Sequence, residues 1–197
     1  MPNYADINGR PMKKLQIQQY LRKLQLNDFE PAVNLATLTK LQDAHLKYIP
    51  YENFDCLNGK ITSLKRQDMF NKVIMHNRGG ICFELNGLYN WLLESLGFDV
   101  TSYSARFIDK METYQLRRHR VMCVALGDKR YLTDVGVNSE SPRVPLEITE
   151  GLIQSDGISQ YKFTRSEFWG WLLWQKERGK IWKRLFGFTE EPQIDKD

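Results

Sequence analysis

The segment RGGICFELNG, residues 78–87, places a cysteine in a setting suited to nucleophilic chemistry. Cys82 follows Gly79 and Gly80, which permit backbone conformations that other residues resist and so allow a tight entry into the helix expected next. In the first turn of a helix, unpaired N–H groups and the helix dipole favour the thiolate, the attacking form of cysteine. A buried structural thiol has no need of this setting. Cys82 is therefore a candidate nucleophile.

A catalytic thiol needs a base, and histidine is the usual one. His45 falls on the apolar stripe of a predicted helix, which indicates a hydrogen-bonded core residue. His76 precedes the glycine loop and stays open as a partner, although a helix end or surface position is favoured. His119 opens a predicted strand in the second half of the chain. A base that comes from a distant segment is typical of thiol triads, so His119 is the preferred candidate.

Asp134, in YLTDVG, is a candidate to orient the imidazole, since a buried carboxylate needs a partner. The alternative is an ordinary aspartate at a strand end. The hairpin register is an obstacle to the triad. If Asp128 and Lys129 formed a two-residue turn, Asp134 would pair with Cys123, and His119 would lie roughly 13 Å further along, at about 3.3 Å per residue. A bulge or a different register is needed to bring them together.

The remaining cysteines point to reduced thiols and to no metal site. Cys123, in VMCVAL, is interpreted as a small core residue, and Cys56, in FDCLNG, as a loop or core thiol. Three cysteines are an odd number without metal-ligand spacing. The first residues, MPNYADINGRPMKK, have neither the apolar core nor the small-residue cleavage site of a secretory signal. We therefore expect a cytoplasmic protein without disulfides.

The composition is ordinary for a globular protein, with 197 residues, 42% of them hydrophobic and 26% charged. The longest apolar runs, such as WGWLLW at 169–174, are too short to span a bilayer, and we expect no membrane partner. The net charge is +4, and the densest basic segments are RRHR at 117–120 and KERGKIWKR at 176–184. We favour a solvated surface over nucleic-acid binding for both, although such a patch can attract a phosphorylated ligand.

The two halves of the chain have different periodicities. Helical spacing is present over 13–26, 35–49, 63–77 and 82–96, with Ser63 as a candidate N-cap and Gly97 as a natural stop. Short β-branched and aromatic runs follow at 98–107, 119–126 and 130–137. The runs at 169–176 and 181–188 indicate a further hairpin, with a helix left open for this aromatic stretch. Helices first and strands second predict an α+β protein, with a helical domain at 1–97 and a strand-rich domain at 98–197.

Several motifs, in this order, resemble those of the arylamine N-acetyltransferases. The resemblance covers nearly the whole chain, and its RGG-x-C-x-E-x-N core is far more specific than the cysteine alone. It implies a helical first domain and an antiparallel β-barrel second domain, distantly akin to thiol proteases and transglutaminases. The motifs are HLKYIPYENFDCLNG (45–59), RGGICFELNGLYNWLLESLGFDV (78–100), RHRVMCVAL (118–126), RYLTDVGV (130–137) and FGFTEEPQ (186–193).

The resemblance implies a catalytic triad of Cys82, His119 and Asp134 and a ping-pong reaction. Cys82 would take an acetyl group from acetyl-CoA as a thioester and pass it to an arylamine, hydrazine or arylhydroxylamine, while His119 manages the protons. Acetyl-CoA is then a co-substrate, and no bound cofactor is expected. The small-molecule acceptor and donor are the expected partners.

Other family positions carry over to residues around the site. Tyr51, in PYEN, matches an aromatic position that lines the family's pocket. Glu52 and Arg78 are family positions that we expect to form a structural ion pair holding the loop of Gly79 and Gly80. Replacing Arg78 with methionine should then weaken both the fold and the activity.

The chain departs from the family pattern in two places. The family's G-F-G after the aspartate, near acceptor and CoA, is Gly136-Val137-Asn138 here, which removes an aromatic wall and one glycine. Gly136 and Val137 remain the expected substrate-binding positions. The family's third, α/β domain is expected to be absent, because little chain follows FTEEPQ. The apolar surface it would cover favours self-association into a homo-oligomer or contact with a partner.

Three alternatives to a fully active acetyltransferase stay open. A shortened family member with an intact triad and poor CoA binding would hydrolyse small acyl esters or thioesters. A non-catalytic remnant would have an unreactive Cys82. A thiol protease is a more distant alternative.

Overall fold

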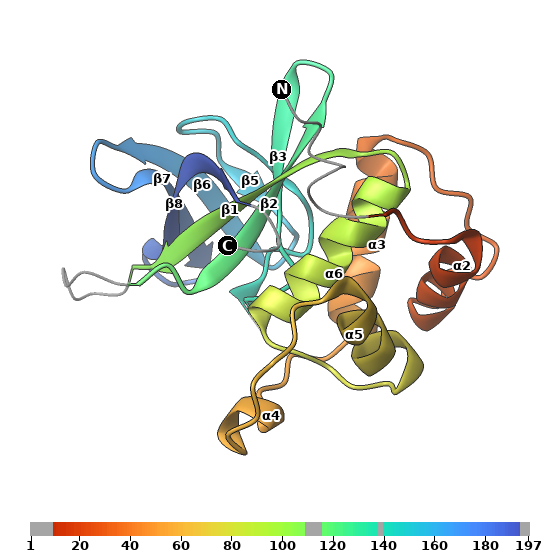
Figure 1. Cartoon of the computed structure of the whole chain (residues 1–197). Coiled ribbons are helices and arrows are strands. Elements are labelled where there is room, and N and C mark those ends of the chain that lie inside the picture. The colour runs from red at the N-terminus through yellow and green to blue at the C-terminus, as the bar shows by residue number, and fades with distance from the viewer. Residues whose placement is uncertain (1–9, 109–115, 138–139, 194–197) are drawn as a thin grey trace.

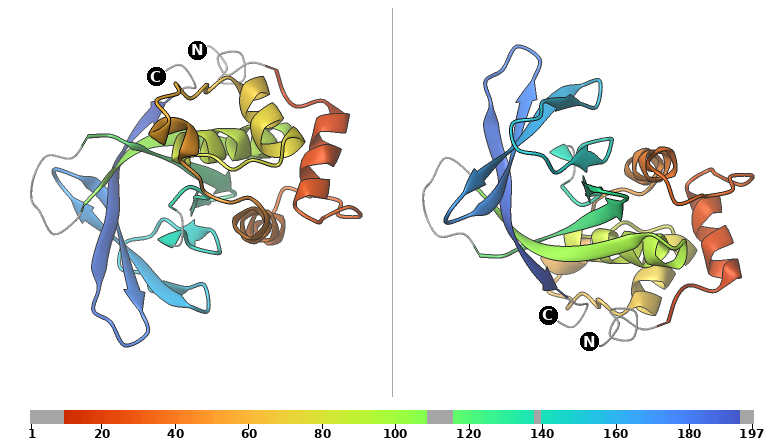
Figure 2. Two further views of the ribbon diagram at one scale, coloured as in Figure 1. Left: turned by 90° about the horizontal axis from the view of Figure 1, so that it is seen from below. Right: turned by 90° about the horizontal axis from the view of Figure 1, so that it is seen from above.

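The computed structural model describes residues 10–108, 116–137 and 140–193, with helices first and strands second (Figure 1). The main helices pack together on one side of the barrel formed by the strands (Figure 2). Among the described residues, none of the helices has the length and apolar character needed to cross a membrane. The helical elements are α2 (Lys14–Lys23), α3 (Leu35–Tyr48), α4 (Phe54–Leu57), α5 (Arg66–Phe70), the π-helical turn η1 (Asn71–Met75) and α6 (Cys82–Ser95).

Within the described ranges, the strands form one antiparallel sheet of eight strands in the order β4-β3-β2-β1-β8-β7-β6-β5. The sheet curls into a nearly closed barrel. Gln154 links its two edge strands, because the Gln154 side-chain amide donates to the Glu147 carbonyl (2.9 Å) and accepts from the Glu147 N–H (2.7 Å). The predicted α+β class with an antiparallel barrel is thus confirmed. The strands are β1 (Asp99–Phe107), β2 (His119–Leu126), β3 (Lys129–Thr133), β4 (Leu146–Glu147), β5 (Gln154–Ser155), β6 (Ser159–Ser166), β7 (Gly170–Glu177) and β8 (Lys183–Gln193).

The sheet separates two hydrophobic cores, and the alternation of side chains along β2 shows how. Val121 and Cys123 belong to the core inside the barrel, while Met122 and Val124 belong to the core shared with the helices. Successive side chains of a strand point to opposite faces, so one strand can supply both cores. The predicted core position of Cys123 is confirmed.

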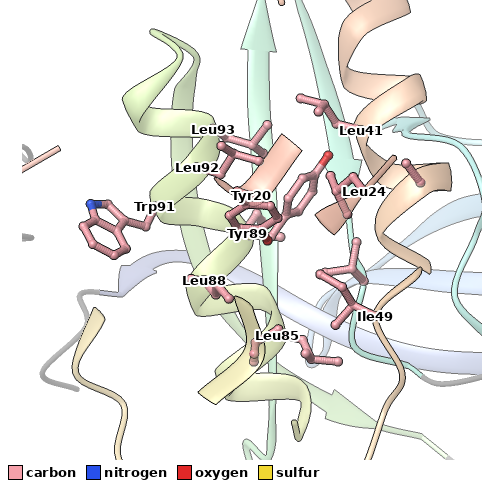
Figure 3. Close-up of a cluster of buried hydrophobic side chains, with 14 of the residues drawn as sticks. Tyr20, Leu24, Leu41, Ile49, Leu85, Leu88, Tyr89, Trp91, Leu92 and Leu93 are labelled. Carbon is pink, nitrogen blue, oxygen red and sulfur yellow. The ribbon is translucent and has the colours of Figure 1, made fainter. Parts of the chain in front are cut away.

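Helix α6 lies at the centre of the helical core (Figure 3). Its residues Leu85, Leu88, Tyr89 and Leu92 are almost completely buried, and Tyr20 and Leu41 from other helices belong to the same cluster. All residues of α6 from Cys82 to Leu93 except Phe83 are buried, as expected of a helix in a protein interior. The packing therefore makes α6 a firm support for its first residue.

The ends of the helices test the predicted stop and cap. Gly97 has φ +91°, a conformation that favours glycine, and it ends α6 as predicted. The predicted N-cap at Ser63 is wrong, because α5 begins at Arg66 and Lys65 is the N-cap. Ser63 instead donates a hydrogen bond from Oγ to Asp68 Oδ2 (2.6 Å).

For the aromatic segment 169–174 the sequence left a helix as an alternative to a strand. In the structure this segment contributes to strand β7, which pairs with β8 in an antiparallel hairpin. Its Trp171 and Leu173 lie in the barrel core. The hairpin prediction is therefore confirmed. An alternating inward and outward pattern, rather than a helical stripe, explains why apolar residues crowd this segment.

Candidate active site

Cys82 is the first residue of α6 and is 8% exposed. Its Sγ lies 3.5 Å from the carbonyl oxygen of Arg118, to which the thiol donates. Arg118 directly precedes β2, so this contact brings the helix start and the strand start together. The Glu84 carboxylate accepts a hydrogen bond from the Ile81 N–H (3.0 Å) and so caps the same helix turn.

His119 is the first residue of β2, and its side chain is completely buried. Its Nε2 lies 2.7 Å from Asp134 Oδ2. The imidazole is flanked by the rings of Phe107 and Phe186, with centroids 5.0 Å and 5.2 Å away. Aromatic contact on these sides and a carboxylate on one nitrogen leave the ring little freedom to turn.

The second ring nitrogen of His119, Nδ1, is buried and has no hydrogen-bond partner among the described residues. Burial by itself would lower the pKa of His119, but the Asp134 carboxylate and the neighbouring Cys82 outweigh it and raise the pKa to about 9. The ring is therefore protonated at neutral pH.

The hairpin register explains how His119 and Asp134 meet. Leu126 pairs with Lys129 and Met122 with Thr133, so the turn is Gly127-Asp128. The register considered from the sequence, with the turn at Asp128-Lys129, is wrong. The true pairing shifts Asp134 toward His119 by two residues, and Asp134 follows directly after β3 ends. No bulge is needed between the two strands.

Asn86, which sequence reasoning assigned no role, joins the two strands to the helix. Its Nδ2 donates to Asp134 Oδ1 (2.8 Å) and to the Arg120 carbonyl (2.5 Å), and its Oδ1 accepts from the Val135 N–H (2.9 Å). Asn86 is four residues after Cys82, hence on the same face of α6. This spacing within the RGG-x-C-x-E-x-N motif is the signal that could have identified it.

Gly136 lies against Cys82. A Cβ at this position would be 2.8 Å from Cys82 Cα and 2.8 Å from Asn86 Nδ2, so a larger residue would clash. The Gly136 N–H also donates to Asp134 Oδ1 (2.8 Å). Val137 is buried in the barrel core, and its contact with a substrate stays a prediction. Asn138 lies outside the described residues.

The glycine loop before Cys82 packs closely on the segment 50–52. The Glu52 N–H donates to the Gly80 carbonyl (3.0 Å), and a Cβ on Gly79 would lie 2.0 Å from the Pro50 carbonyl oxygen. Neither Gly79 nor Gly80 has a positive φ. The expected reason for the two glycines, backbone freedom, is therefore wrong, and close packing is the reason.

The predicted ion pair of Glu52 and Arg78 is present, with Arg78 Nε 2.8 Å from Glu52 Oε1. It belongs to a larger network that the sequence did not reveal. Lys72, on the π-helical turn η1, contacts the buried Glu84 carboxylate (2.8 Å) and Asp55 (2.9 Å). The network therefore ties the glycine loop, η1 and the first turn of α6 together.

Tyr51 is 38% exposed and pairs with Gly80 through an isolated bridge. Partial burial raises the pKa of Tyr51, and electrostatic interaction with Cys82 and with Cys56 raises it further. The other candidates lie elsewhere: Cys56 and His76 are exposed. His45 is buried as predicted, but within the described ranges neither of its ring nitrogens has the expected hydrogen-bond partner.

Comparisons with known proteins agree with this architecture. A family model described as N-acetyltransferase matches residues 34–197. The arylamine N-acetyltransferase of Mycolicibacterium smegmatis is 36% identical over 180 residues, which are 88% of this chain and 64% of that protein. The enzyme of the same name from Escherichia coli K12 is 31% identical over 167 residues, or 83% of this chain and 59% of that protein.

Solved structures give the same result. The arylamine N-acetyltransferase from Salmonella typhimurium matches with a TM-score of 0.88 and 27% identity, over 94% of this chain and 67% of that one. The chain spans less than two thirds of the length of the two curated relatives above. Because the family model covers most of the sequence and the barrel and helices follow those of solved members, the chain belongs to the arylamine N-acetyltransferase family.

Proposed function

We propose that the chain transfers an acetyl group from acetyl-CoA, through a thioester on Cys82, to an arylamine, hydrazine or arylhydroxylamine. The observation that carries the proposal is the meeting of Cys82, His119 and Asp134 at one buried point from three separate segments. A thiol, a charged imidazole and an orienting carboxylate are the parts of a nucleophilic acyl-transfer site.

In the first half-reaction, the Cys82 thiolate attacks the carbonyl carbon of acetyl-CoA. The bond between that carbon and the CoA sulfur breaks, and the sulfur leaves as a thiol with the proton of the His119 imidazolium. The His119 pKa of about 9 supports this step, since the ring holds a proton to give at neutral pH. The first N–H groups of α6 have no partner within the helix and are suited to bind the oxyanion.

In the second half-reaction, the acceptor nitrogen attacks the Cys82 thioester and gives its proton to the now neutral His119. The bond between the acetyl carbon and Sγ breaks, which restores the thiolate and the imidazolium. Asp134 keeps Nε2 engaged throughout, so Nδ1 is the nitrogen left to exchange protons with the reacting groups. Tyr51, Gly136 and Val137 are the described positions that would border the acceptor.

A cavity of about 400 Å³ is suited to the phosphates of the donor. Its lining includes Arg106, Arg117, Trp169 and Thr189. Arg117 directly precedes Arg118, whose carbonyl oxygen Cys82 contacts. Arg117 is paired with Glu191, whereas Arg106 has no carboxylate partner among the described residues. We assign the phosphate contact to Arg106. The same proposal places the enzyme in the cytoplasm, where thiols stay reduced.

The test is intact-mass spectrometry of the purified chain mixed with acetyl-CoA, beside Cys82→Ala. We expect one acetyl adduct on the wild type, none on the variant, and loss of the adduct when an arylamine such as 4-aminosalicylate is added. The acetylated amine must appear in the same amount.

Two other results would overturn the proposal in different ways. An adduct that water discharges as fast as the arylamine does would indicate a thioester hydrolase. No adduct, from a folded protein whose Cys82 reacts slowly with iodoacetamide, would indicate a non-catalytic protein. Cys56→Ser is the background for the alkylation, because Cys56 is the exposed thiol.

A further inference from the structure

The hairpin of β7 and β8 carries the chain's basic excess. Residues 176–184, KERGKIWKR, contain five basic side chains and one acidic side chain, a net charge of +4 that equals the net charge of the whole chain. The sequence alone favoured a merely solvated surface here. In the structure, basic side chains of this region alternate with tryptophan rings, an arrangement that a solvated surface does not need.

Three strands place a row of residues side by side on the outer face of the barrel. Lys162 of β6 pairs with Trp174 of β7, and Trp174 pairs with Arg184 of β8. The neighbours Tyr161 and Leu173 point into the barrel core, so the row faces outward. A cation, an indole and a second cation therefore follow one another across the sheet.

The cations of this face contact indole rings rather than carboxylates. The Lys162 ammonium lies 4.6 Å from the Trp182 ring centroid and 5.8 Å from that of Trp174. Arg184 lies 5.9 Å from the Trp174 centroid, and Lys176 lies 6.0 Å from that of Trp182. Within the described part of the chain, Lys162, Lys176 and Arg184 have no ion pair. Their charge is thus available to an anionic partner.

The tip of the hairpin carries one strongly exposed apolar side chain beside the exposed Arg178 and Lys180. Ile181 is 86% exposed, next to Trp182 and Lys180. Figure 2 shows the β7–β8 hairpin projecting from the barrel, away from the helical side. The tip is therefore free to reach a surface without involving α6 or the glycine loop.

We propose that this hairpin docks on an anionic lipid surface. Ile181 would enter the headgroup region, Trp182 would lie at its boundary, and Lys162, Lys176 and Arg184 would face the lipid phosphates. Side chains with apolar bodies and charged or polar ends favour this boundary, and basic residues are attracted by the negative cytoplasmic leaflet. A peripheral contact of this kind needs no membrane-spanning helix, and it does not depend on the proposed acetyl transfer.

Single-stranded nucleic acid is a poorer match to the same face. Base stacking needs open indole faces, but Lys162 and Arg184 already lie over Trp174, and Lys162 and Lys176 over Trp182. An isoleucine at the tip has no counterpart in a phosphate backbone. An exposed isoleucine beside an indole and several cations corresponds instead to the mixed apolar and charged boundary of an anionic bilayer.

The test is co-sedimentation of the full chain with phosphatidylcholine vesicles that contain about 30% phosphatidylserine, at low salt. We expect binding to these vesicles, none to phosphatidylcholine alone, and release at about 0.5 M salt. The double variant Lys162→Gln, Lys176→Gln should weaken partitioning about 30-fold, at about fivefold per charge. Ile181→Ser should weaken it several-fold and leave the salt dependence unchanged.

The matched control is Lys40→Gln, Lys47→Gln on α3. These lysines also lie over aromatic rings, those of Phe29 and Tyr48, but on the helical side. The control removes the same charge. Its vesicle partitioning should differ from that of the wild type by less than about fivefold, the effect expected of one basic residue at the membrane surface. Equal losses in both double variants, or no binding of the wild type, would overturn the proposal. Binding of a single-stranded oligonucleotide through Lys162 and Lys176 without vesicle binding would overturn it as well.

Discussion

The loop before Cys82 and the strand ends that carry His119 and Asp134 meet at one site but are held in different ways. The loop is held by charges: Arg78 with Glu52, and Lys72 with Glu84. The outer end of this network borders solvent, since the Arg78 side chain is 40% exposed, whereas the Glu84 side chain is 3% exposed. Salt and substitution should therefore affect the Arg78 end gradually.

His119 and Asp134 are held by buried hydrogen bonds. Asp134 accepts from Asn86 and from the Gly136 N–H while it faces His119, and the side chains of Asp134 and His119 are completely buried. A buried polar group that loses a partner has no water to replace it. The comparison teaches that the outer part of the loop's support can weaken by degrees, whereas the contacts that hold His119 and Asp134 are buried throughout and are sensitive to a single substitution.

Among the substitutions that test this comparison, Asp134→Asn should have the largest effect on activity. It removes the negative charge that raises the pKa of His119, so we expect acylation of Cys82 to slow by about 10³–10⁴-fold. Rapid mixing with acetyl-CoA and mass spectrometry measures the rate. Asp156→Asn is the control, because Asp156 also accepts backbone hydrogen bonds but contacts none of the three site residues. Near-wild-type acylation in Asp134→Asn would remove Asp134 from the proposed mechanism.

The pH dependence of stability gives a second measurement on the base. The pKa of His119 rises from 6.5 to about 9 on folding, so the proton is held more tightly in the native state. This stabilisation is fully present below pH 6.5 and is lost as the pH rises through about 9, by up to about 3 kcal/mol. Urea unfolding at several pH values should show the decrease in the wild type. In Asp134→Asn the curve should be flatter, and an equally steep curve would contradict the assignment.

Asn86→Ala should destabilise the fold and the site together. The change leaves Asp134, the Arg120 carbonyl and the Val135 N–H each short of one buried hydrogen bond, which should lower the free energy of unfolding by about 3 kcal/mol. Alkylation of Cys82 by iodoacetamide should also slow. Asn90→Ala is the matched control, because Asn90 is buried one turn later and contacts Glu94 and Ser102 instead. If both variants alkylate equally fast, Asn86 has only a structural role.

Lys72→Met tests the inner part of the charge network. Glu84 is 2% exposed, and without Lys72 its carboxylate is buried without a cation, at a cost of about 2–3 kcal/mol of stability. Glu84→Gln in the same chain should recover much of this loss. A double-mutant cycle from denaturant unfolding measures the coupling. Additive losses would show that the two side chains do not stabilise each other.

Arg78→Met should have the smallest effect. The Arg78 side chain is the most exposed member of the network, so we expect a modest decrease in Tm and in the alkylation rate at low salt, shrinking toward zero at about 0.5 M salt. Thermal unfolding at the two salt concentrations measures it. A stable, fully reactive variant at low salt would refute the role of the pair in holding the loop.

The sequence allowed the candidate reactive residues to be predicted better than the contacts that hold them in place. Cys82 before a helix and His119 at a strand start were visible as patterns, because local spacing determines both. The register of the hairpin was not, since Asp128-Lys129 and Gly127-Asp128 are both acceptable turns and only the packing of the whole sheet chooses between them. A shift of two residues keeps every side chain on its face, so periodicity could not detect the error.

Contacts between distant segments were also beyond the sequence. The clash of a Cβ at Gly79 with Pro50 depends on where another loop passes, and Asn86 acts through atoms of Arg120 and Val135. The predicted hydrogen bond of His45 failed for a related reason. The helical stripe predicted that His45 lies in the core. It did not show whether a polar atom of another segment lies within hydrogen-bond distance of the ring.

Strand β8, the last in sequence among the described residues, lies in the middle of the sheet between β1 and β7. During synthesis, β1 and β2 leave the ribosome well before β8, so the barrel cannot form until almost the whole described chain is available. Phe186, on β8, is also one of the rings against His119. A nascent chain that already displays Cys82 therefore lacks a fixed His119, and the candidate site is complete only after translation has passed β8.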